Sequence, residues 1–256
     1  MHDPTELRLL DAWEKGLLQQ AVNRALSLLK VGYPEQSMKT LAGITIGERD
    51  ARLLMLRQAL FGFRMTSTTK CPACSERLEW ESNVSDLLVR QVDPPPDCAS
   101  GASQRAADLL EITVEKYRIK CRLPNSDDLF FSAGQTDARV MRKQLIERCL
   151  IEATTEDGES MSFDQLSETA LQAVVEEMET ADPQANLQID LSCPACGHCW
   201  AVVFDIVSYL WAEIDAWAQR MLRTVHLLAK RYGWREADIL AMSPMRRQIY
   251  LEMARQ

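Results

Sequence analysis

Two identical Cys-Pro-Ala-Cys segments carry the clearest chemistry in the sequence. The first contributes Cys71 and Cys74, and the second contributes Cys193 and Cys196. Two cysteines separated by two residues can place both sulfurs on one metal ion, and two such pairs complete the tetrahedral four-sulfur shell that zinc prefers in closed structural sites. We therefore predict one structural zinc ion held by these four thiolates.

The two segments are far apart, because Cys193 follows Cys71 by 122 positions, whereas most zinc ribbons space their pairs by tens of residues. Closing so long a loop costs an entropy that grows only slowly with its length. The chain after each segment also aligns at this one offset, matching Leu78 with Trp200, Trp80 with Val202 and Val84 with Ile206. This weak duplication favours one joint site.

Other interpretations of the cysteines fit the sequence less well. A redox-active Cys-x-x-Cys pair should begin a helix in a strand–helix unit, and neither segment does so. His198 or Cys199 could replace one of the four thiolates, but both lie where a strand is expected to begin, which favours ordinary strand positions. The remaining cysteines have no spaced partner and are expected to pack or to be exposed thiols: Cys98, Cys121 and Cys149.

No arrangement of catalytic residues accompanies the cysteines. A catalytic zinc keeps an open position and usually has histidine or carboxylate ligands. The three histidines, His2, His198 and His226, form no His-Glu-x-x-His pattern, and the sequence has neither a phosphate-binding glycine loop nor a Gly-x-Ser-x-Gly elbow. The carboxylates between 176 and 179 are typical of a solvated helix face. We predict a protein that is not an enzyme and has no small-molecule substrate.

Composition points to a soluble globular chain, with 46% hydrophobic and 26% charged residues. The net charge of -8 and the pI near 5.1 argue against broad binding of nucleic acid or anionic membranes. We expect no signal peptide at the start and no membrane span, and therefore a cytoplasmic protein. Thiols stay reduced there, which favours metal binding over disulfides.

Apolar spacing and capping residues predict mostly helices. They are expected over 6–30, 45–60, 137–153, 163–180 and 208–231, with a short helix after Trp234 and a last one from Ser243–Pro244. Thr45 with Glu48, and Ser162 with Gln165, have the spacing of capping boxes. Gly62 and Gly233 are predicted helix ends, Gly233 in the left-handed conformation.

Extended segments interrupt these helices. Alternation predicts a strand after the first cysteine pair, a hairpin over 112–123 turning at Glu115 and Lys116, and a β-ribbon over 187–204 around the second pair. The segment 91–104, with three consecutive prolines, is predicted to be a loop. Pro124 to Asp128 should end the hairpin and cap another helix.

The predicted fold class is α+β and mostly helical, with two β-ribbons that carry the cysteine pairs, are joined by one zinc ion and are flanked by helices. We divide the chain into a helical segment at 1–66, a zinc-ribbon region with inserted helices at 67–206 and C-terminal helices at 207–256, with one compact unit from about residue 41.

The apolar stripe of the first helix is either core or a docking face. Arg246 and Arg247 are either exposed or contact a partner's carboxylates, and Trp211, Trp217 and Tyr232 are expected in the core.

Three stretches together resemble the T-even phage baseplate protein family, which also occurs in phage-tail-like contractile injection systems. The first is IGERDARLL at 46–54 with LFG at 60–62; the second is CPACGH at 193–198 with Trp200 and LWAEID at 210–215; the third begins with YGW at 232–234 and continues through Glu236, Ile239, Leu240, Ser243, Pro244, Arg246 and Arg247 to Tyr250 and Leu251. The likeness covers most of the chain from Leu41 onward. The T-even namesake has no obvious counterpart of the paired cysteines, which places the zinc site in the bacterial-type variants.

This resemblance implies a non-enzymatic structural component or assembly factor of a contractile phage-tail-like baseplate, whose partners are other baseplate and tail proteins and which is incorporated into a tail or injection particle. The alternative is a zinc-ribbon adaptor or regulator that binds nucleic acid or other proteins. Lys70 and Arg77 beside the first pair would suit it, but the surrounding carboxylates make the ribbons poor phosphate binders: Glu76, Glu79, Glu81, Asp190 and Asp205.

Overall fold

A computed structural model describes residues 6–89, 109–132 and 137–254 of the chain. The predicted loop at 91–104, Cys98 and His2 lie outside these ranges. The chain divides into two compact units, one formed by Met1–Pro34 with Val207–Gln256 and the other by Glu35–Ile206. No helix in the described part of the chain combines the length and the apolar character needed to span a membrane.

The first unit is entirely helical in its described part. It contains α1 (Glu6–Gly16), α2 (Ala21–Gly32), α9 (Ile206–Tyr232), α10 (Glu236–Leu240) and α11 (Pro244–Ala254). Leu10 of α1 packs against Ala218 and Met221 of α9. The indole Nε1 of Trp13 also donates to Asp215 Oδ1 at 2.9 Å. The first helix therefore uses its apolar stripe as core.

The prediction of one helix over 6–30 is wrong, because α1 ends at Gly16 and α2 begins at Ala21. A Cβ atom at residue 16 would lie 2.4 Å from a ring carbon of Trp211, so the close approach of α1 to α9 requires glycine there. Arg24 Nε donates to the Gly16 carbonyl at 2.9 Å and satisfies the end of α1. Apolar spacing continued across this break, which is why periodicity did not reveal it.

The C-terminal helices agree with prediction. Leu210, Ile214 and Leu228 of α9 are fully buried, while the large aromatic side chains predicted as core, Trp211, Trp217 and Tyr232, are half-buried. Gly233 ends α9 with φ +72°.

The two arginines of the last helix have different roles. Arg247 is 3% exposed, donates to the carbonyls of Ile239, Leu240 and Met242, and pairs with Glu6. Its role is therefore internal. Arg246, by contrast, is exposed.

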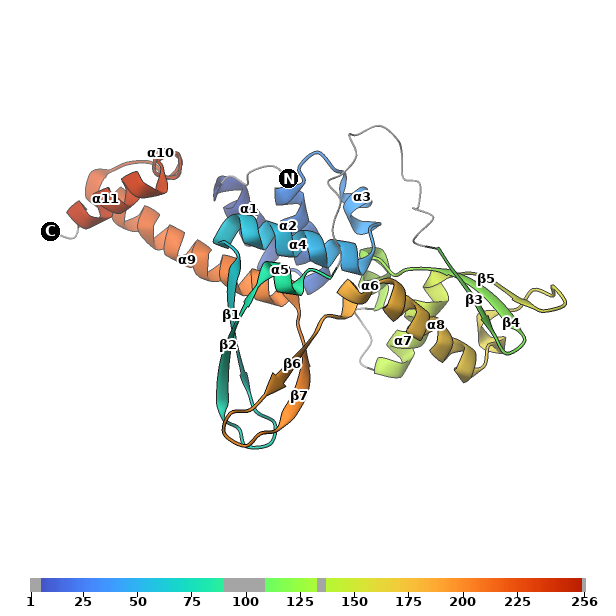
Figure 1. The fold of residues 1–256 in the computed structure, drawn as a ribbon. Helices are drawn as coiled ribbons and strands as arrows, with labels where there is room; N and C mark the ends of the chain where they lie inside the picture. Colours follow the sequence, from blue (N-terminus) through green and yellow to red (C-terminus); the bar gives the residue numbers. More distant parts are fainter. Residues whose placement is uncertain (1–5, 90–108, 133–136, 255–256) are drawn as a thin grey trace. The chain divides into compact units, whose positions relative to one another are not determined.

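The second unit combines helices with three small antiparallel sheets (Figure 1). Its elements are α3 (Met38–Ala42), α4 (Ile46–Phe61), β1 (Arg64–Lys70), β2 (Arg77–Asn83), α5 (Val84–Leu87), β3 (Leu109–Val114), β4 (Tyr117–Arg122), α6 (Ser126–Ser132), α7 (Ala138–Cys149), β5 (Leu150–Thr155), η2 (Phe163–Gln165), α8 (Glu168–Ala181), η3 (Pro183–Asn186), β6 (Gln188–Ser192) and β7 (Cys199–Val203). The predicted class, α+β with mostly helices and two ribbons, is confirmed.

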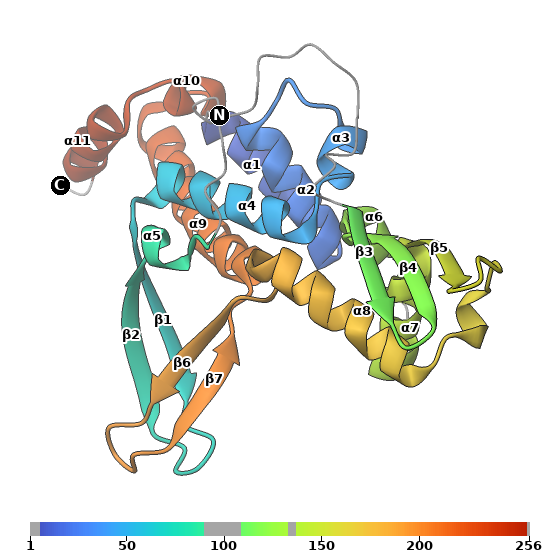
Figure 2. The same ribbon diagram turned by 45° about the vertical axis from the view of Figure 1, so that its right-hand side comes forward.

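One part of this unit is a three-stranded sheet packed against α7 and α8 (Figure 2). The predicted hairpin is confirmed as β3 and β4, with Glu115 at the turn in a left-handed conformation, φ 51°. The helix predicted over 137–153 is wrong beyond Cys149, because the chain continues as β5 and pairs with β4. Ile151 and the threonines of 154–155 are β-branched, and pairing with β4 outweighs the helical spacing.

The helix predicted over 163–180 is also shorter than expected. Ser162 and Gln165 do form a capping box, but it caps the 3₁₀ turn η2. The α-helix begins only at Glu168, where Ser167 is the N-cap and accepts from Ala170 N at 3.0 Å.

Asp128 is the buried charge that ties the sheet to its helices. Arg122 and Arg148 both donate to it, at 2.6 and 3.1 Å. Burial alone would raise the pKa of Asp128, but these guanidinium groups and the Asn125 N–H outweigh burial and hold the pKa below its ordinary value. The carboxylate therefore stays ionised and paired.

Helix α4 begins where the sequence predicts. Thr45 Oγ1 accepts from Glu48 N at 3.2 Å, but the Glu48 carboxylate pairs with Arg52 rather than completing the predicted box. Asp182 Oδ2 instead accepts from Gly47 N at 2.8 Å. A Cβ atom at residue 47 would lie 1.8 Å from Asp182 Oδ1. Glycine at this position therefore allows the carboxylate to reach the first turn of α4.

We predict that Gly47→Ala destabilises the protein by about 2 kcal/mol, because the added methyl group must displace Asp182 from the helix end. Denaturant unfolding monitored by circular dichroism would measure the change. Gly43→Ala is the matched control, because its φ of -83° is ordinary and its Cβ would lie 3.3 Å from the Lys39 carbonyl oxygen and 3.8 Å from that of Thr40. Equal stability of the two variants would contradict the prediction.

Candidate metal centre

Two antiparallel hairpins position the four cysteines. One hairpin is β1–β2 and the other is β6–β7, and their loops meet at the tips (Figure 1). Cys71 follows directly on β1, and Cys193 follows directly on β6. Most residues of the four strands are exposed or half-buried. An isolated two-stranded hairpin is marginally stable in water, so contacts between the tips matter for both hairpins.

The two cysteine loops have the same backbone geometry. In the first, Cys71 N donates to Glu76 O and Ser75 N donates to Cys71 O, both at 2.9 Å. The second loop has both bonds 122 positions further along the chain: Cys193 N donates to His198 O at 2.9 Å, and Gly197 N donates to Cys193 O at 2.8 Å. Ser75 and its equivalent Gly197 both adopt the left-handed conformation, with φ values of 64° and 71°. The duplication suggested by the sequence is therefore confirmed as a structural repeat.

The repeat extends beyond the loops. Strands β1 and β6 end, and β2 and β7 begin, at positions 122 apart. Helices α5 and α9 follow at the same offset, starting at Val84 and Ile206, which are both buried. Each half is thus a strand, a cysteine loop, a second strand and a helix.

The four sulfurs lie together, although no bond joins them. The Sγ atoms of Cys71 and Cys196 are 3.7 Å apart, those of Cys74 and Cys193 are 3.6 Å apart, and all four lie within 4.8 Å of one another. A disulfide requires about 2.05 Å. A tetrahedral shell with zinc–sulfur bonds of about 2.3 Å separates its sulfurs by about 3.8 Å. The spacing therefore fits a metal ion better than it fits disulfides.

The thiols of this cluster interact electrostatically. Burial acts to raise the pKa of Cys71, but the N–H groups of Cys74 and Ala73 and the neighbouring thiols lower it to about 7. For Cys74 the Glu76 N–H acts to lower the pKa, but the thiols of Cys196 and Cys193 and burial raise it to about 12. Contacts among the thiols thus contribute in opposite directions to the pKa values of Cys71 and Cys74, as expected for interacting titratable groups. A bound cation would relieve the repulsion between thiolates.

The alternative ligands lie outside the cluster. His198 stacks on Trp200 with ring centroids 5.8 Å apart, and Cys199 opens β7 with its sulfur 3.6 Å from Ser192 Oγ. Among the described residues, these four cysteines form the one group of histidine, cysteine or carboxylate side chains that could hold a metal ion. Cys121 and Cys149 are buried, and burial raises the pKa of their thiols to about 11 and about 12.

Ser75 is the residue of the site that the sequence prediction missed. Its left-handed backbone closes the first loop, as glycine closes the second. The offset of 122 positions would have revealed it, because that offset aligns Ser75 with Gly197.

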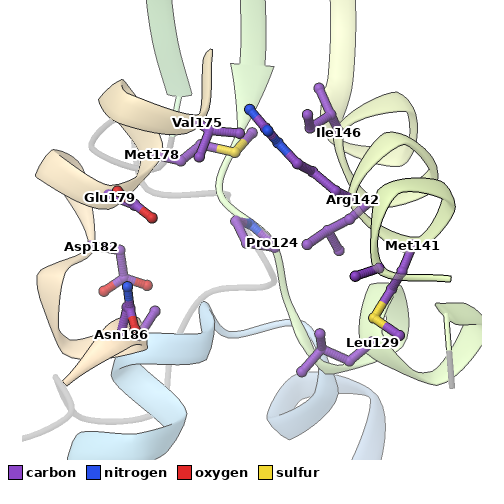
Figure 3. Close-up of a pocket in the computed structure, with 13 residues that line it drawn as sticks. Pro124, Leu129, Met141, Arg142, Ile146, Val175, Met178, Glu179, Asp182 and Asn186 are labelled. Carbon is purple, nitrogen blue, oxygen red and sulfur yellow. The ribbon is translucent and has the colours of Figure 1, made fainter. Parts of the chain in front are cut away.

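A separate cavity of about 300 Å³ lies among α6, α7 and α8 (Figure 3). Its walls are mainly apolar and include Leu129, Met141 and Val175. Arg142 also lines the cavity and donates to Gln172 Oε1 at 2.6 Å. Glu179, Asp182 and Asn186 also line the cavity, and the Asp182 carboxylate is already bound to Gly47 N at the start of α4.

The family model described as T4 bacteriophage base plate protein matches residues 15–211 of this chain. The match contains both Cys-Pro-Ala-Cys segments. It begins before Leu41, where the sequence resemblance was expected to begin, and it ends before the third resembling stretch at 232–251. No curated protein matches the chain, and no solved structure matches it.

The repeat predicts opposite effects of two substitutions. Ser75→Gly should stabilise the first loop, whereas Gly197→Ala should destabilise the second by about 1 kcal/mol, because only glycine adopts positive φ without strain. No atom lies within 4 Å of a Cβ placed on Gly197, so strain alone is tested. Denaturant midpoints of the two variants and the wild type would measure both effects. Destabilisation of similar size by both substitutions would contradict the equivalence of the loops.

Proposed function

We propose that this chain, which belongs to the T4 bacteriophage base plate protein family, is a non-enzymatic scaffold. It acts in the baseplate of a contractile phage-tail-like particle. The observation that carries the proposal is the family match over 15–211, which includes both hairpins and the sheet of the second unit. Membership of this family makes the chain a structural baseplate component. Its contacts are therefore with other tail and baseplate proteins.

We further propose that Cys71, Cys74, Cys193 and Cys196 bind one structural zinc ion. Three features of the site support zinc: four sulfur donors, sulfur separations near those of a tetrahedral shell, and backbone N–H groups directed at the thiolates. Four protein ligands leave no open position for substrate or water, which suits a structural role rather than catalysis. The ion would join two hairpins that are 122 residues apart in sequence.

The proposed zinc site suggests the variant of the family that occurs in contractile injection systems. The T-even namesake has no obvious counterpart of the paired cysteines, so the site distinguishes this chain within the family. We propose that the protein is part of the assembled particle rather than a transient assembly factor. The family match supports this choice, because its description is that of a base plate protein.

We predict one zinc ion per chain, measured by elemental analysis of the purified protein and by native mass spectrometry. The double variant Cys71→Ser with Cys193→Ser should lose the zinc ion, because it removes one sulfur ligand from each hairpin and leaves only two of the four. Its unfolding should begin at a lower denaturant concentration, because metal-binding free energy is folding free energy at such sites.

Cys199→Ser is the matched control, since Cys199 is exposed and near the site but lies outside the four-sulfur cluster. It should retain the full zinc content. Zinc absent from the wild type, or zinc retained by the double serine variant, would refute the shared site. Loss of zinc from the Cys199→Ser variant would instead make Cys199 a ligand.

The baseplate role predicts that a tagged copy of the chain co-purifies with assembled tail particles from its own host. Mass spectrometry of particles separated by density should detect it in constant ratio to the tube and sheath proteins. Detection in assembly intermediates alone would make it an assembly factor. Absence from both particles and intermediates would contradict the baseplate role.

A further inference from the structure

The charges of this chain are strongly segregated along the sequence. Residues 149–219 contain 14 aspartates and glutamates and no lysine or arginine. Residues 216–235 contain five lysines and arginines and no aspartate or glutamate. An acidic block is thus followed directly by a basic one, in a chain whose net charge is -8. Such asymmetry is informative about partners rather than about the fold.

The basic block places its charges along the solvent face of α9. Arg220, Arg223, Leu227 and Arg231 follow one another at offsets of 0, 3, 7 and 11, which lie on one side of a helix, and all four are exposed. The opposite side of α9 is buried through Val225 and Leu228. Within its own unit, none of these three arginines forms an ion pair with a described carboxylate. We call these four residues the basic stripe.

The acidic block presents a matching row on α8. Glu179, Gln172, Glu176 and Glu168 are exposed on one side of that helix, while Ala170, Leu171 and Val174 are buried on the other. The Gln172 amide donates to Glu176 Oε1 at 2.9 Å and orients it. Arg142 of α7 donates to Gln172 Oε1 at 2.6 Å, and Lys143 lies 3.9 Å from Glu168, with both members of that pair exposed. Glu179 also lines the cavity between α7 and α8, while Glu176 has no ion pair with a described cation. We call these four residues the acidic stripe.

The two stripes have the same spacing when one is read backwards. From Glu179 toward the N-terminus of α8, the acidic stripe has offsets of 0, 3, 7 and 11, as the basic stripe has from Arg220 toward its C-terminus. Antiparallel helices would therefore pair Arg220 with Glu179, Arg223 with Glu176, Leu227 with Gln172 and Arg231 with Glu168. Each stripe spans about 16 Å, because an α-helix rises about 1.5 Å per residue.

We propose that the basic stripe on α9 of one copy binds the acidic stripe on α8 of a second copy, with the two helices antiparallel. The contact is heterologous, because different surfaces of the two copies meet. Repetition of such a contact closes into a ring or extends into an open chain. This self-association goes beyond the proposed scaffold role and does not depend on the zinc ion.

Nucleic acid is a poorer partner for the basic stripe. The same chain carries the 14 carboxylates of residues 149–219, which would repel phosphates. A phosphate backbone also does not account for the matching offsets on α8. An exposed leucine in the centre of the stripe suits a protein surface, where apolar and arginine side chains are enriched.

Sedimentation of the full-length protein as purified, over a dilution series, tests the proposal. At an ionic strength of about 0.01 M the weight-average mass should rise with concentration above the 29.1 kDa of one chain. At about 1 M it should return to that of one chain, because the Debye length falls from about 30 Å to about 3 Å. A mass that stays at the 29.1 kDa of one chain at every concentration at low salt would overturn the proposal.

A charge exchange tests the pairing itself. The basic-stripe variant carries Arg220→Glu, Arg223→Glu and Arg231→Glu, and the acidic-stripe variant carries Glu168→Lys, Glu176→Lys and Glu179→Lys. Each alone should associate at least about tenfold more weakly than the wild type, whereas an equimolar mixture should regain association, because each variant complements the other. Failure of the mixture to associate would overturn the pairing.

A matched control carries Lys39→Glu, Arg118→Glu and Arg139→Glu, which change the net charge equally at exposed positions outside the stripes. It should associate like the wild type, and loss of association would show that net charge alone is responsible. If a reversed variant fails the circular dichroism check for folding, the corresponding glutamine substitutions replace it, with the same expected loss of association. Salt-sensitive binding of a DNA duplex that competes with self-association and is lost in the basic-stripe variant would assign the stripe to nucleic acid instead.

Discussion

The close approach of four cysteine sulfurs is the contact on which the two hairpins depend. Neutral thiols at 3.6–3.7 Å attract one another weakly, and thiolates at that distance repel. The hairpins themselves bury little surface, so their strands cannot supply the missing stability. A cation among the sulfurs changes this balance, because it turns the repulsion of thiolates into attraction. The geometry of the tips is therefore compatible with a metal ion bound among the four sulfurs.

The structural repeat explains how one site can be built from such distant segments. Each half contains the same loop hydrogen bonds, a left-handed residue at the same position (Ser75 or Gly197) and a helix that starts at the same offset. Because the halves are equivalent, each contributes one buried and one exposed cysteine. The loops thus need no adjustment to each other beyond meeting at their tips. The long segment between them could diverge in sequence without disturbing the site.

Much of the fold was predictable where local signals decide it. Thr45, Ser243 and Gly233 mark helix boundaries because capping and positive φ are local properties, and the cysteine loops follow from spacing alone. The break at Gly16 was not predictable, because it depends on a ring of Trp211 nearly 200 residues away. The strand after Cys149 was missed for a similar reason, since pairing with β4 decides its conformation. The three-part division of the chain stays a prediction.

The position of the site within the chain also indicates what the metal ion would and would not hold. Between the two cysteine loops lies the three-stranded sheet, which has its own hydrophobic core with Ile119, Leu171 and Val174 among its buried residues and its own buried ion pair at Asp128. Neither this core nor the ion pair includes a residue of the hairpin tips. The hairpins have no comparable core, so they depend on the junction far more. A metal ion at that junction would hold the two hairpins together, and with them the two ends of the inserted part. That is the task of a scaffold, and it needs no open coordination position.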